Sequence, residues 1–367
     1  MGKPKICFFN SNREWGGGEK WHYEYSEALS ADGYETIFFA QPGSILAEKI
    51  QESGKQQFVP IKISNLSFLN PRKVKSLKKI FLRENIDTII LNLPADLKSA
   101  GLAAKKAGIP NRIYRRGSAI PIKNTFLNRY LFREIVSRVI VNSGKTAETI
   151  LENNPKLIDR TKIDIIYNGI DLKKYDSWTG NIYEPKEGEI VLGNLGRLSE
   201  QKCQDLLIEV AAILRQKGLR FVLLIGGTGE KEAELRQLVK THKLEDFVRF
   251  LGFIEVSREF MNSIDLFVLT SKWEGFGYVL VEAAAANLPV VAFDISSNPE
   301  VVENKITGEL IKPFKLEEMA AQIEILAADK LKRIALGRAG RKMVEEKFQF
   351  SSSLKKLKKL LADDNQS

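Results

Sequence analysis

The 367-residue chain contains only two cysteines and two histidines. Cys7 and Cys203 lie far apart, which excludes a disulfide framework and a cysteine-rich zinc site. Low cysteine use fits a reducing compartment, so we expect a cytoplasmic protein. No apolar run approaches the roughly 18 residues that cross a bilayer. The apolar start, at residues 6–9, is too short for a signal peptide and is better explained as a first strand.

Composition and charge narrow the class of protein further. With 44% hydrophobic and 28% charged residues, the chain has the make-up of a soluble globular protein, and its length predicts two domains. Residues 1–172 hold 27 Lys and Arg against 17 Asp and Glu, and the rest of the chain holds 29 of each. The whole net charge of +10 therefore lies in the first half. Such a half suits nucleic acid, anionic lipid or an acidic small molecule.

Short apolar segments alternate with helical patterns along the whole chain, and we found no internal repeat. This alternation predicts an α/β protein with two Rossmann-like domains, each a doubly wound parallel sheet. The expected divisions are an N-terminal domain (1–172), a polar linker (173–188), a C-terminal domain (189–338), and a final helix and tail (339–367).

The stretch 266–294 is the most informative. It contains an apolar strand, a polar glycine-containing loop, a helix former series and a second apolar strand, which together make a βαβ unit. The start of its helix offers unpaired N–H groups to an anion. Glu274 and Glu282 are eight residues apart and can face one pocket, where we expect them to accept hydrogen bonds from hydroxyl groups. The alternative is that both are solvated surface residues.

Two cations follow the first strand of the second half. Arg197 and Lys202 come just after Gly196, at a loop and helix start where an arginine fork and a mobile ammonium suit a diphosphate. Plain surface solvation is the alternative. Glycines at 226–229 allow close backbone approach to a phosphate or sugar. The strand end at 248–253 can hold a base by backbone hydrogen bonds, so the second half predicts a nucleotide-diphosphate site.

Two features of the first half stay open. The glycine loop at 16–19 (GGGE) lies between a strand and a helix, but it is not the dinucleotide fingerprint G-x-G-x-x-G, which disfavours a dehydrogenase. It can equally be a tight turn. The segment 71–83 is amphipathic and basic. It fits either a helix lying on an anionic membrane or an ordinary packed helix with a solvated basic face.

These motifs together resemble the retaining nucleotide-sugar glycosyltransferases of family 4. The resemblance rests on GRL with Gln201 and Lys202, GGTGE (226–230), VRFLGF (248–253) and EGFGYVLVE (274–282), with weaker support from GGGE and from NGID at 168–171. It implies the GT-B fold, in which an acceptor-binding N-terminal domain (1–172) and a nucleotide-sugar-binding C-terminal domain (189–338) face each other across a cleft and the final helix and tail (339–367) pack on the first domain. It also implies no cofactor and metal-independent chemistry, in keeping with the lack of an Asp-x-Asp motif.

The resemblance also implies roles for individual residues. Glu274 would contact the donor sugar, Glu282 the ribose, and Arg197 with Lys202 would offset the charge of the leaving group. Glycines of the first loop would let it approach the diphosphate. The expected donor-binding residues are Gly17, Gly18, Gly227, Thr228, Phe253, Gly275, Phe276, Gly277, Tyr278 and Glu282.

The chain departs from the family at one position. Where the family often has a histidine before glycine that contacts the donor sugar, this sequence reads Arg115-Arg116-Gly117. The two histidines, His22 and His242, lie in helical patterns and are expected to have structural roles or none. Our hypothesis is that Arg116 recognises an anionic group on donor or acceptor, which makes Arg116, Arg197, Lys202 and Glu274 the expected catalytic set.

The expected function is therefore transfer of a sugar, with retention, from a nucleoside-diphosphate sugar to a hydroxyl acceptor. UDP is the expected carrier because it is the commonest in the family. Bacterial cell-surface polysaccharide, lipopolysaccharide core or a lipid-linked saccharide would suit the basic first domain, which can also bind the inner face of the cell membrane. A nucleotide-sugar epimerase or hydrolase is the enzymatic alternative. A nucleic-acid-binding protein is favoured by charge alone and leaves the second half unexplained.

Overall fold

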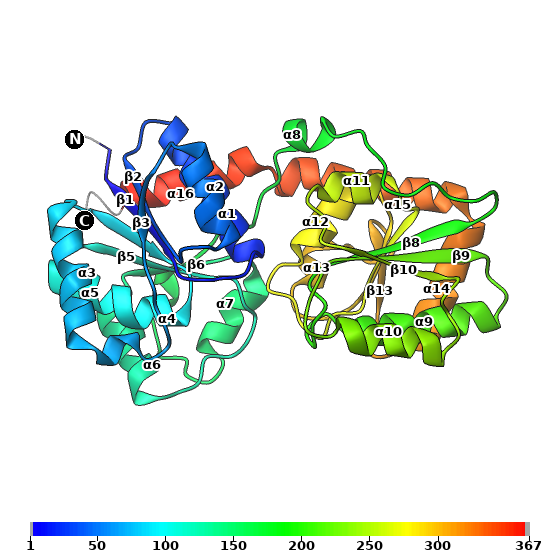
Figure 1. Ribbon diagram of the computed structural model, residues 1–367, viewed down its shortest axis with the longest axis horizontal. Coiled ribbons are helices and arrows are strands. Elements are labelled where there is room, and N and C mark those ends of the chain that lie inside the picture. The colour runs from blue at the N-terminus through cyan, green and yellow to red at the C-terminus, as the bar shows by residue number, and fades with distance from the viewer. Residues whose placement is uncertain (1–2, 364–367) are drawn as a thin grey trace. The chain divides into compact units, whose positions relative to one another are not determined.

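The computed structural model describes residues 3–363, which divide into two compact units. Unit 1 comprises the chain up to Tyr167 together with the C-terminal segment from Ser353, and unit 2 comprises Asn168–Ser352. Figure 1 shows a central sheet with helices on both faces in each unit. No helix among residues 3–363 is long and apolar enough to cross a membrane.

Unit 1 is built on a seven-stranded sheet whose strands are all parallel. Its order is β3-β2-β1-β4-β5-β6-β7. The chain therefore adds β2 and β3 on one side of β1 and then β4 to β7 on the other side. The strands are β1 (Ile6–Asn10), β2 (Thr36–Ala40), β3 (Gln57–Pro60), β4 (Thr88–Leu91), β5 (Asn111–Arg116), β6 (Arg138–Val141) and β7 (Ile163–Ile165). The covering helices are α1 (Gly17–Ala31), α2 (Ile45–Ser53), α3 (Pro71–Arg83), α4 (Pro94–Asp96), α5 (Leu102–Ala107), α6 (Phe126–Tyr130) and α7 (Gly144–Leu151).

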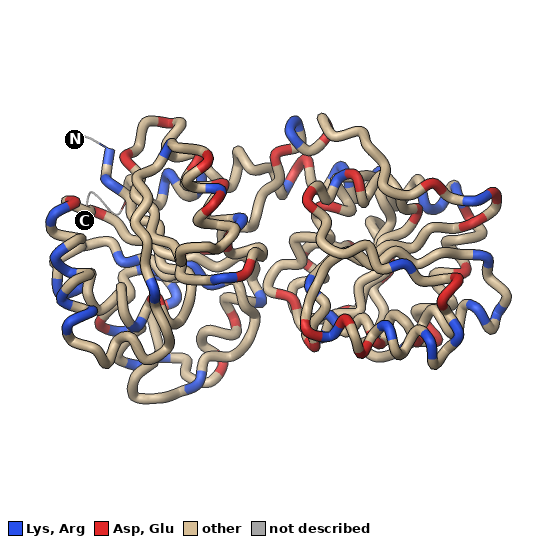
Figure 2. The backbone as a smooth tube through the Cα atoms, viewed as in Figure 1, with Lys and Arg blue, Asp and Glu red and all other residues tan. Residues whose placement is uncertain are grey.

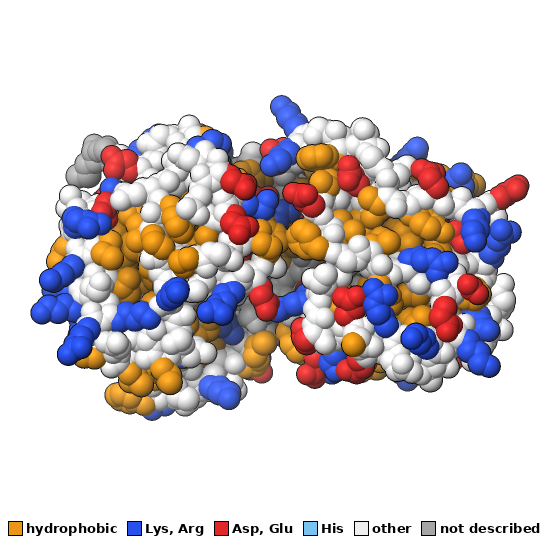
Figure 3. Space-filling view, viewed as in Figure 1, with side chains coloured by type: hydrophobic (Ala, Val, Ile, Leu, Met, Phe, Trp, Pro, Cys, Tyr) orange, Lys and Arg blue, Asp and Glu red, His pale blue; other side chains and the backbone are white. Residues whose placement is uncertain are grey.

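Helix α3 resolves the question that its amphipathic sequence posed. Val74, Leu77 and Phe81 are buried, and the helix packs against α5 as part of the core of unit 1. Phe81 also meets the ring of Phe39 edge-on at 5.6 Å between centroids. Of the two interpretations of this segment, the ordinary packed helix with a solvated basic face is the correct one, because the protein core occupies the apolar face. Arg72, Lys75, Lys79 and Arg83 of this helix are exposed. Figure 2 marks the Lys and Arg positions along the backbone, and Figure 3 shows basic side chains on the surface of the molecule.

Unit 2 contains a six-stranded parallel sheet of order β10-β9-β8-β11-β12-β13. Its strands are β8 (Ile190–Leu195), β9 (Phe221–Gly226), β10 (Val248–Gly252), β11 (Leu266–Leu269), β12 (Val290–Phe293) and β13 (Gly308–Ile311). Its helices are α8 (Leu172–Asp176), α9 (Gln204–Gln216), α10 (Glu232–Thr241), α11 (Ser257–Asn262), α12 (Tyr278–Ala285), α13 (Asn298–Val301), α14 (Leu316–Ala328) and α15 (Lys330–Lys347). The two parallel, doubly wound sheets confirm the predicted fold class.

The bounds of the two units differ from the expected domain bounds at both places where the chain passes from one unit to the other. Residues 168–188, expected to end the first domain and form the linker, belong to unit 2. There Tyr175 donates a hydrogen bond to the carbonyl of Glu282 at 2.8 Å, and Asp176 forms a two-pronged ion pair with Arg341. Residues 339–352, expected on the first domain, also belong to unit 2 because α15 packs on α12.

The C-terminal segment returns to unit 1 only from Ser353, within α16 (Phe350–Asp363). Ser353 donates a hydrogen bond to the carbonyl of Tyr167 at 2.8 Å, and Lys358 forms an ion pair with Asp32. Leu357 and Leu361 are buried. Residues 354–361 thus form part of an amphipathic helix whose buried leucines belong to unit 1.

Candidate functional site

The strand order of unit 2 reverses between β8 and β11, and the loops after these two strands are tied together. Neighbouring parallel strands whose crossovers leave in opposite directions open a crevice at their carboxyl ends, where open α/β sheets bind ligands. The backbone N–H of Lys272 donates to the carbonyl of Gln201 at 2.8 Å, and the Gln201 side chain donates to the carbonyl of Trp273 at 2.9 Å. Thr270 donates to the carbonyl of Cys203 at 2.8 Å. The two loops therefore act as one wall.

Lys202 and Glu274 meet on this wall. The Lys202 Nζ lies 2.7 Å from Glu274 Oε1, and Ser271 Oγ donates to the same oxygen at 2.6 Å. Glu274 is only 5% exposed, and Ser297 donates to its carbonyl at 3.2 Å. Two donors on one carboxylate oxygen fix the side chain and leave Oε2 for another donor. Sequence reasoning missed Ser271, although its position three residues before Glu274 could have suggested it.

The glycines after β9 have a structural reason that the sequence did not show. Gly227 has φ +126°, and a Cβ at this position would collide with the carbonyl of Gly196. A Cβ on Gly229 would collide with the carbonyl of Leu198 in the same way. Leu198 in turn donates its N–H to the carbonyl of Thr228 at 3.0 Å. These glycines let the loops after β8 and β9 touch backbone to backbone, which shapes the edge of the candidate site.

Helix α12 begins at the same edge. Its N-cap is Gly277, with φ +73° and no side-chain cap, so the first N–H groups of the helix are not covered by a capping side chain. Phe276 is buried, and its ring meets Phe348 edge-on. The Tyr278 hydroxyl donates to the carbonyl of Gly169 at 3.0 Å. Gly275 precedes this group in the loop.

Glu282 lies within α12 and has different partners from Glu274. It is 7% exposed and accepts a hydrogen bond from Ser257 Oγ at 2.9 Å. Its carbonyl accepts the hydroxyl of Tyr175. Glu282 is thus a buried, fixed carboxylate rather than the solvated surface residue of the alternative interpretation, as is Glu274.

The remaining predicted residues of unit 2 are exposed at the carboxyl ends of their strands. Arg197 follows β8, and its carbonyl accepts from Gln204 at 3.0 Å. Thr228 follows β9, and Phe253, which follows β10, is 58% exposed. The structure therefore brings Lys202 and Glu274 into contact and places the other residues at the carboxyl ends of the parallel strands. Gly17, Gly18 and Arg116 belong to unit 1.

Unit 1 has a cavity of its own at the carboxyl ends of β1, β4 and β5. It measures about 450 Å³, a size typical of small-molecule sites. Its lining comprises Asn12, Gly18, Glu19, Asn92, Leu93, Pro94, Tyr114, Arg115, Arg116, Gly117, Ser118 and Ile120. The cavity thus joins the glycine loop to the Arg-Arg-Gly sequence that departs from the family pattern. Gly17 lies beside it on the surface, with nothing near its Cβ position.

A buried charge network forms one wall of this cavity. Glu19 Oε1 accepts hydrogen bonds from Asn92 at 3.0 Å and Asn10 at 3.2 Å. The Arg115 guanidinium lies over the Trp21 ring at 5.4 Å from its centroid. Burial lowers the pKa of Arg115 to about 10, against the opposing effect of Glu19, so the group stays cationic at neutral pH. Sequence reasoning missed Arg115, Asn92 and the role of Glu19, because these contacts join distant strands.

Arg116 also lines this cavity. One terminal nitrogen donates to the carbonyl of Ile120, and the Tyr114 hydroxyl is a close neighbour. Its Nε is buried and has no hydrogen-bond partner among the described residues. His22 is fully buried against Phe8, and His242 pairs with Glu209 at 3.0 Å, so neither histidine is placed in the cavity wall.

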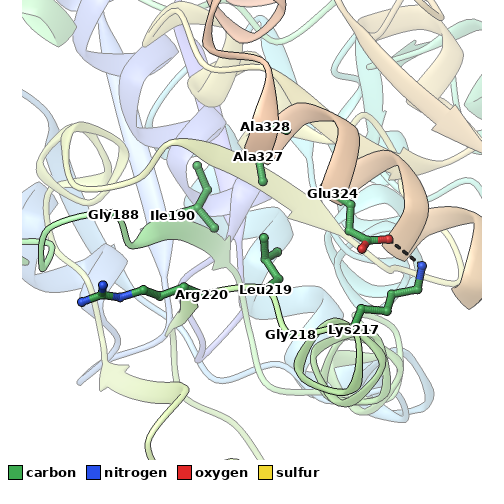
Figure 4. Close-up of a pocket in the computed structure, with 9 residues that line it drawn as sticks. All are labelled: Gly188, Ile190, Lys217, Gly218, Leu219, Arg220, Glu324, Ala327 and Ala328. Atoms are coloured by element: carbon green, nitrogen blue, oxygen red, sulfur yellow. Dashed lines mark hydrogen bonds and ion pairs between the residues drawn. The ribbon is translucent and has the colours of Figure 1, made fainter.

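A hollow of about 500 Å³ in unit 2 lies at the opposite end of its sheet, where β8 and β9 begin (Figure 4). Gly188, Ile190 and Arg220 line it, and Lys217 forms an ion pair with Glu324 at 2.5 Å across its rim. None of the predicted residues lies here, and ligands of open α/β sheets bind at the other edge. Among residues 3–363, no cluster of three or more His, Cys, Asp or Glu side chains could hold a metal ion.

Comparison with known proteins gives two family matches that divide the chain between them. Residues 15–174 match the model described as Glycosyltransferase Family 4, and residues 180–343 match that of Glycosyl transferases group 1. The amylovoran biosynthesis glycosyltransferase AmsK of Erwinia amylovora is 29% identical over 209 residues, which are 54% of this chain and 50% of that protein. The matched regions span 46–65% of the lengths of three such relatives.

Other similarities extend over nearly the whole chain. The UDP-Gal:alpha-D-GlcNAc-diphosphoundecaprenol alpha-1,3-galactosyltransferase of Escherichia coli is 24% identical over 355 residues, 92% of this chain and 91% of that protein. The crystal structure of Anabaena HepE with UDP and glucose superposes with a TM-score of 0.84, covering 98% of this chain and all of HepE at 21% identity. With matches to both halves and this shared architecture, the chain belongs to glycosyltransferase family 4 and has the GT-B fold.

Proposed function

We propose that this protein transfers a sugar from a nucleoside-diphosphate sugar to a hydroxyl group of a saccharide acceptor. The observation that carries the proposal is the contact between Lys202 and Glu274 at the strand-order reversal of unit 2, beside the uncapped start of α12. A cation and helix N–H groups suit a diphosphate, and a fixed carboxylate suits sugar hydroxyls. Family membership supports the same conclusion.

In the proposed reaction, the bond between the anomeric carbon and the β-phosphate oxygen breaks while the acceptor hydroxyl forms a new bond to that carbon. The acceptor attacks from the face that the diphosphate leaves, so configuration is retained, and the hydroxyl proton passes to a leaving phosphate oxygen. Lys202 and Arg197 offset the charge that builds on the diphosphate. Glu274, already bound by Lys202 and Ser271, serves as an acceptor for sugar hydroxyls rather than as a nucleophile.

Glu282 is proposed to bind the ribose hydroxyls and the β10 end, with Phe253, to hold the base. Gly275, Phe276 and Gly277 would contribute backbone groups to sugar and phosphate, with Tyr278 and Thr228 beside them. UDP is the proposed carrier, supported by the UDP bound to HepE. Thermal unfolding with UDP, GDP and ADP tests this: a ligand at 100 times its Kd stabilises the folded state by about 2.7 kcal/mol. A larger shift with GDP or ADP would contradict the choice of UDP.

Retention and metal independence are part of the proposal. Cationic side chains at the diphosphate would take the role that a metal ion has in other transferases. Product NMR should show the anomeric configuration of the donor, and EDTA should leave the rate unchanged. Inversion would refute the reaction path above, and loss of rate in EDTA restored by Mg²⁺ or Mn²⁺ would refute the role given to the cations. Sugar release without an acceptor requirement would favour a hydrolase.

The proposed acceptor is a bacterial surface polysaccharide, lipopolysaccharide core or lipid-linked saccharide, as the names of the AmsK and Escherichia coli relatives suggest. The exposed charges of α3, including Arg72, Lys75 and Lys79, would hold the protein at an anionic membrane by electrostatics, since the apolar face of that helix is buried. Flotation with vesicles should then require anionic lipid and weaken with salt. Equal flotation with neutral vesicles would contradict this mode of binding.

A further inference from the structure

The cavity of unit 1 combines two kinds of recognition in one space. Glu19 and Asn92 form a polar wall that is nine-tenths or more buried, and Arg116 lies at the end of β5 in the same lining. A fixed carboxylate and a carboxamide are groups that bind sugar hydroxyls. A guanidinium is the group that binds carboxylates and phosphates with two parallel hydrogen bonds.

The charges of the lining do not cancel. Among the lining residues, Glu19 is the one acidic residue, and Arg115 and Arg116 are both basic. The buried guanidinium of Arg115 is the one that interacts electrostatically with Glu19. Asp96 accepts a hydrogen bond from Ser11 and is not among the lining residues. Because burial raises its pKa to about 7, it carries only part of its charge at neutral pH. A positive charge is therefore left over at Arg116.

The hydrogen bonding of Arg116 is also incomplete. Its Nε is buried and has no hydrogen-bond partner among the described residues, so the guanidinium is incompletely satisfied. One terminal nitrogen donates to the carbonyl of Ile120, which also lines the cavity. An anionic ligand that binds the terminal nitrogens would compensate the left-over charge.

We infer that this cavity binds an acidic sugar: a saccharide unit whose hydroxyls meet Glu19 and Asn92 and whose anionic substituent, a carboxylate or a phosphate ester, meets Arg116. The inference rests on the proposed transferase function in assigning that unit to the acceptor. A neutral sugar leaves the Arg116 charge uncompensated, so the acidic form is selected over the neutral one. The volume of about 450 Å³ suits a single sugar unit.

The test measures binding of small probes to the full chain by NMR titration, with and without saturating UDP. D-glucuronate should bind at least about tenfold more tightly than D-glucose, which lacks the carboxylate, because a charge-assisted hydrogen bond is stronger than a neutral one. Glucose 6-phosphate separates the two anionic sources: tighter binding than glucuronate assigns a phosphate ester, and weaker binding assigns a carboxylate. Equal affinity for glucose and both acids would overturn the inference.

Variants assign the effect to Arg116. Arg116→Gln should abolish the preference for the acidic probes, Arg116→Lys should keep part of it, and Tyr114→Phe should weaken it only slightly. Arg129→Gln is the matched control, since Arg129 lies half-buried on α6, donates to Asn124 and does not line the cavity. Melting temperatures of all four variants show whether they fold. An unchanged preference in folded Arg116→Gln overturns the inference, as does inorganic pyrophosphate competing more strongly than either acid, which would assign Arg116 to the donor.

The two proposals fail separately. UDP binding is assigned to unit 2 and does not depend on Arg116. If the wild-type protein binds glucuronate but not UDP, the transferase function is refuted and the acidic-sugar site stands. UDP binding without any preference for acidic sugars would do the reverse.

Discussion

Lys202 and Glu274 are 72 residues apart in sequence, and their charged atoms lie 2.7 Å apart. The contact joins the loop after β8 to the loop after β11, so the group proposed to meet the diphosphate and the group proposed to meet the sugar hold each other in place. An exposed ion pair contributes little to stability, but this pair is largely buried and shares an oxygen with Ser271. Its geometry is therefore set before any ligand binds.

Replacing Lys202 by Met should lower kcat by about 10²–10³-fold, the cost typical of removing one group that stabilises developing negative charge. Initial rates with saturating donor and acceptor measure this. Lys217→Met is the matched control: it also breaks an ion pair of unit 2, with Glu324, but at the opposite end of the sheet. A Lys202→Met enzyme within threefold of the wild-type rate would contradict the assigned role.

Two serines allow the roles of the two glutamates to be separated. Ser271→Ala frees Glu274 and should lower kcat about tenfold with little change in the donor KM, because the sugar contact matters in the transition state. Ser257→Ala frees Glu282 and should raise the donor KM with kcat nearly unchanged, because ribose binding is the same in ground and transition states. Full kinetics of both variants decide this. Identical effects would show that the glutamates share one role.

The strands and their polar carboxyl ends could be predicted because each depends on local sequence. Thus the stretch 266–294 contains the two strands and the helix expected of it, as β11, α12 and β12. The partners of those ends could not be predicted, because they depend on which strands become neighbours. The glycines at 226–229 predict room for a ligand but not the contact of Gly227 with Gly196, and the sequence does not connect Glu19 to Asn92. The pattern of α3 likewise shows an apolar face but not what covers it.

Substitutions at three glycines separate a glycine that the fold requires from one that is expected to contact the ligand. Gly227→Ala should destabilise the protein most, because its Cβ meets the Gly196 carbonyl at a positive φ, and Gly277→Ala should cost about 1–2 kcal/mol for its left-handed conformation. Gly17→Ala should leave stability unchanged or higher, since nothing lies near its Cβ and it begins a helix. Denaturation midpoints measure these. Lost activity in a fully stable Gly17→Ala would support the expected approach of that loop to the diphosphate.

His22 should make the protein less stable in mild acid. Burial, and then the charge of Arg115, hold its pKa well below the usual value. The unfolded chain therefore takes up a proton at about pH 6.5 while the folded protein does not, so stability present above this pH is lost as the pH falls below it. His22→Leu should remove this loss and, by replacing two unpartnered ring nitrogens, raise the melting temperature at pH 7. His242→Gln is the control, and a His22→Leu profile parallel to wild type between pH 7.5 and 5 would contradict the prediction.

Asp96 should act in the opposite direction. Burial raises its pKa to about 7, despite hydrogen bonds from Ser11 and Leu93, so the folded protein keeps a proton that the unfolded chain releases near its ordinary pKa of 3.8. Stability is then lost as the pH rises through this range, by about 4 kcal/mol in all if each pKa unit contributes about 1.36 kcal/mol. Asp96→Asn has no such titration, and although its amide breaks one hydrogen bond at every pH, its stability relative to wild type should rise steadily between pH 4 and pH 8. Urea unfolding at four pH values measures that difference, and a difference independent of pH would show that Asp96 is ionised throughout.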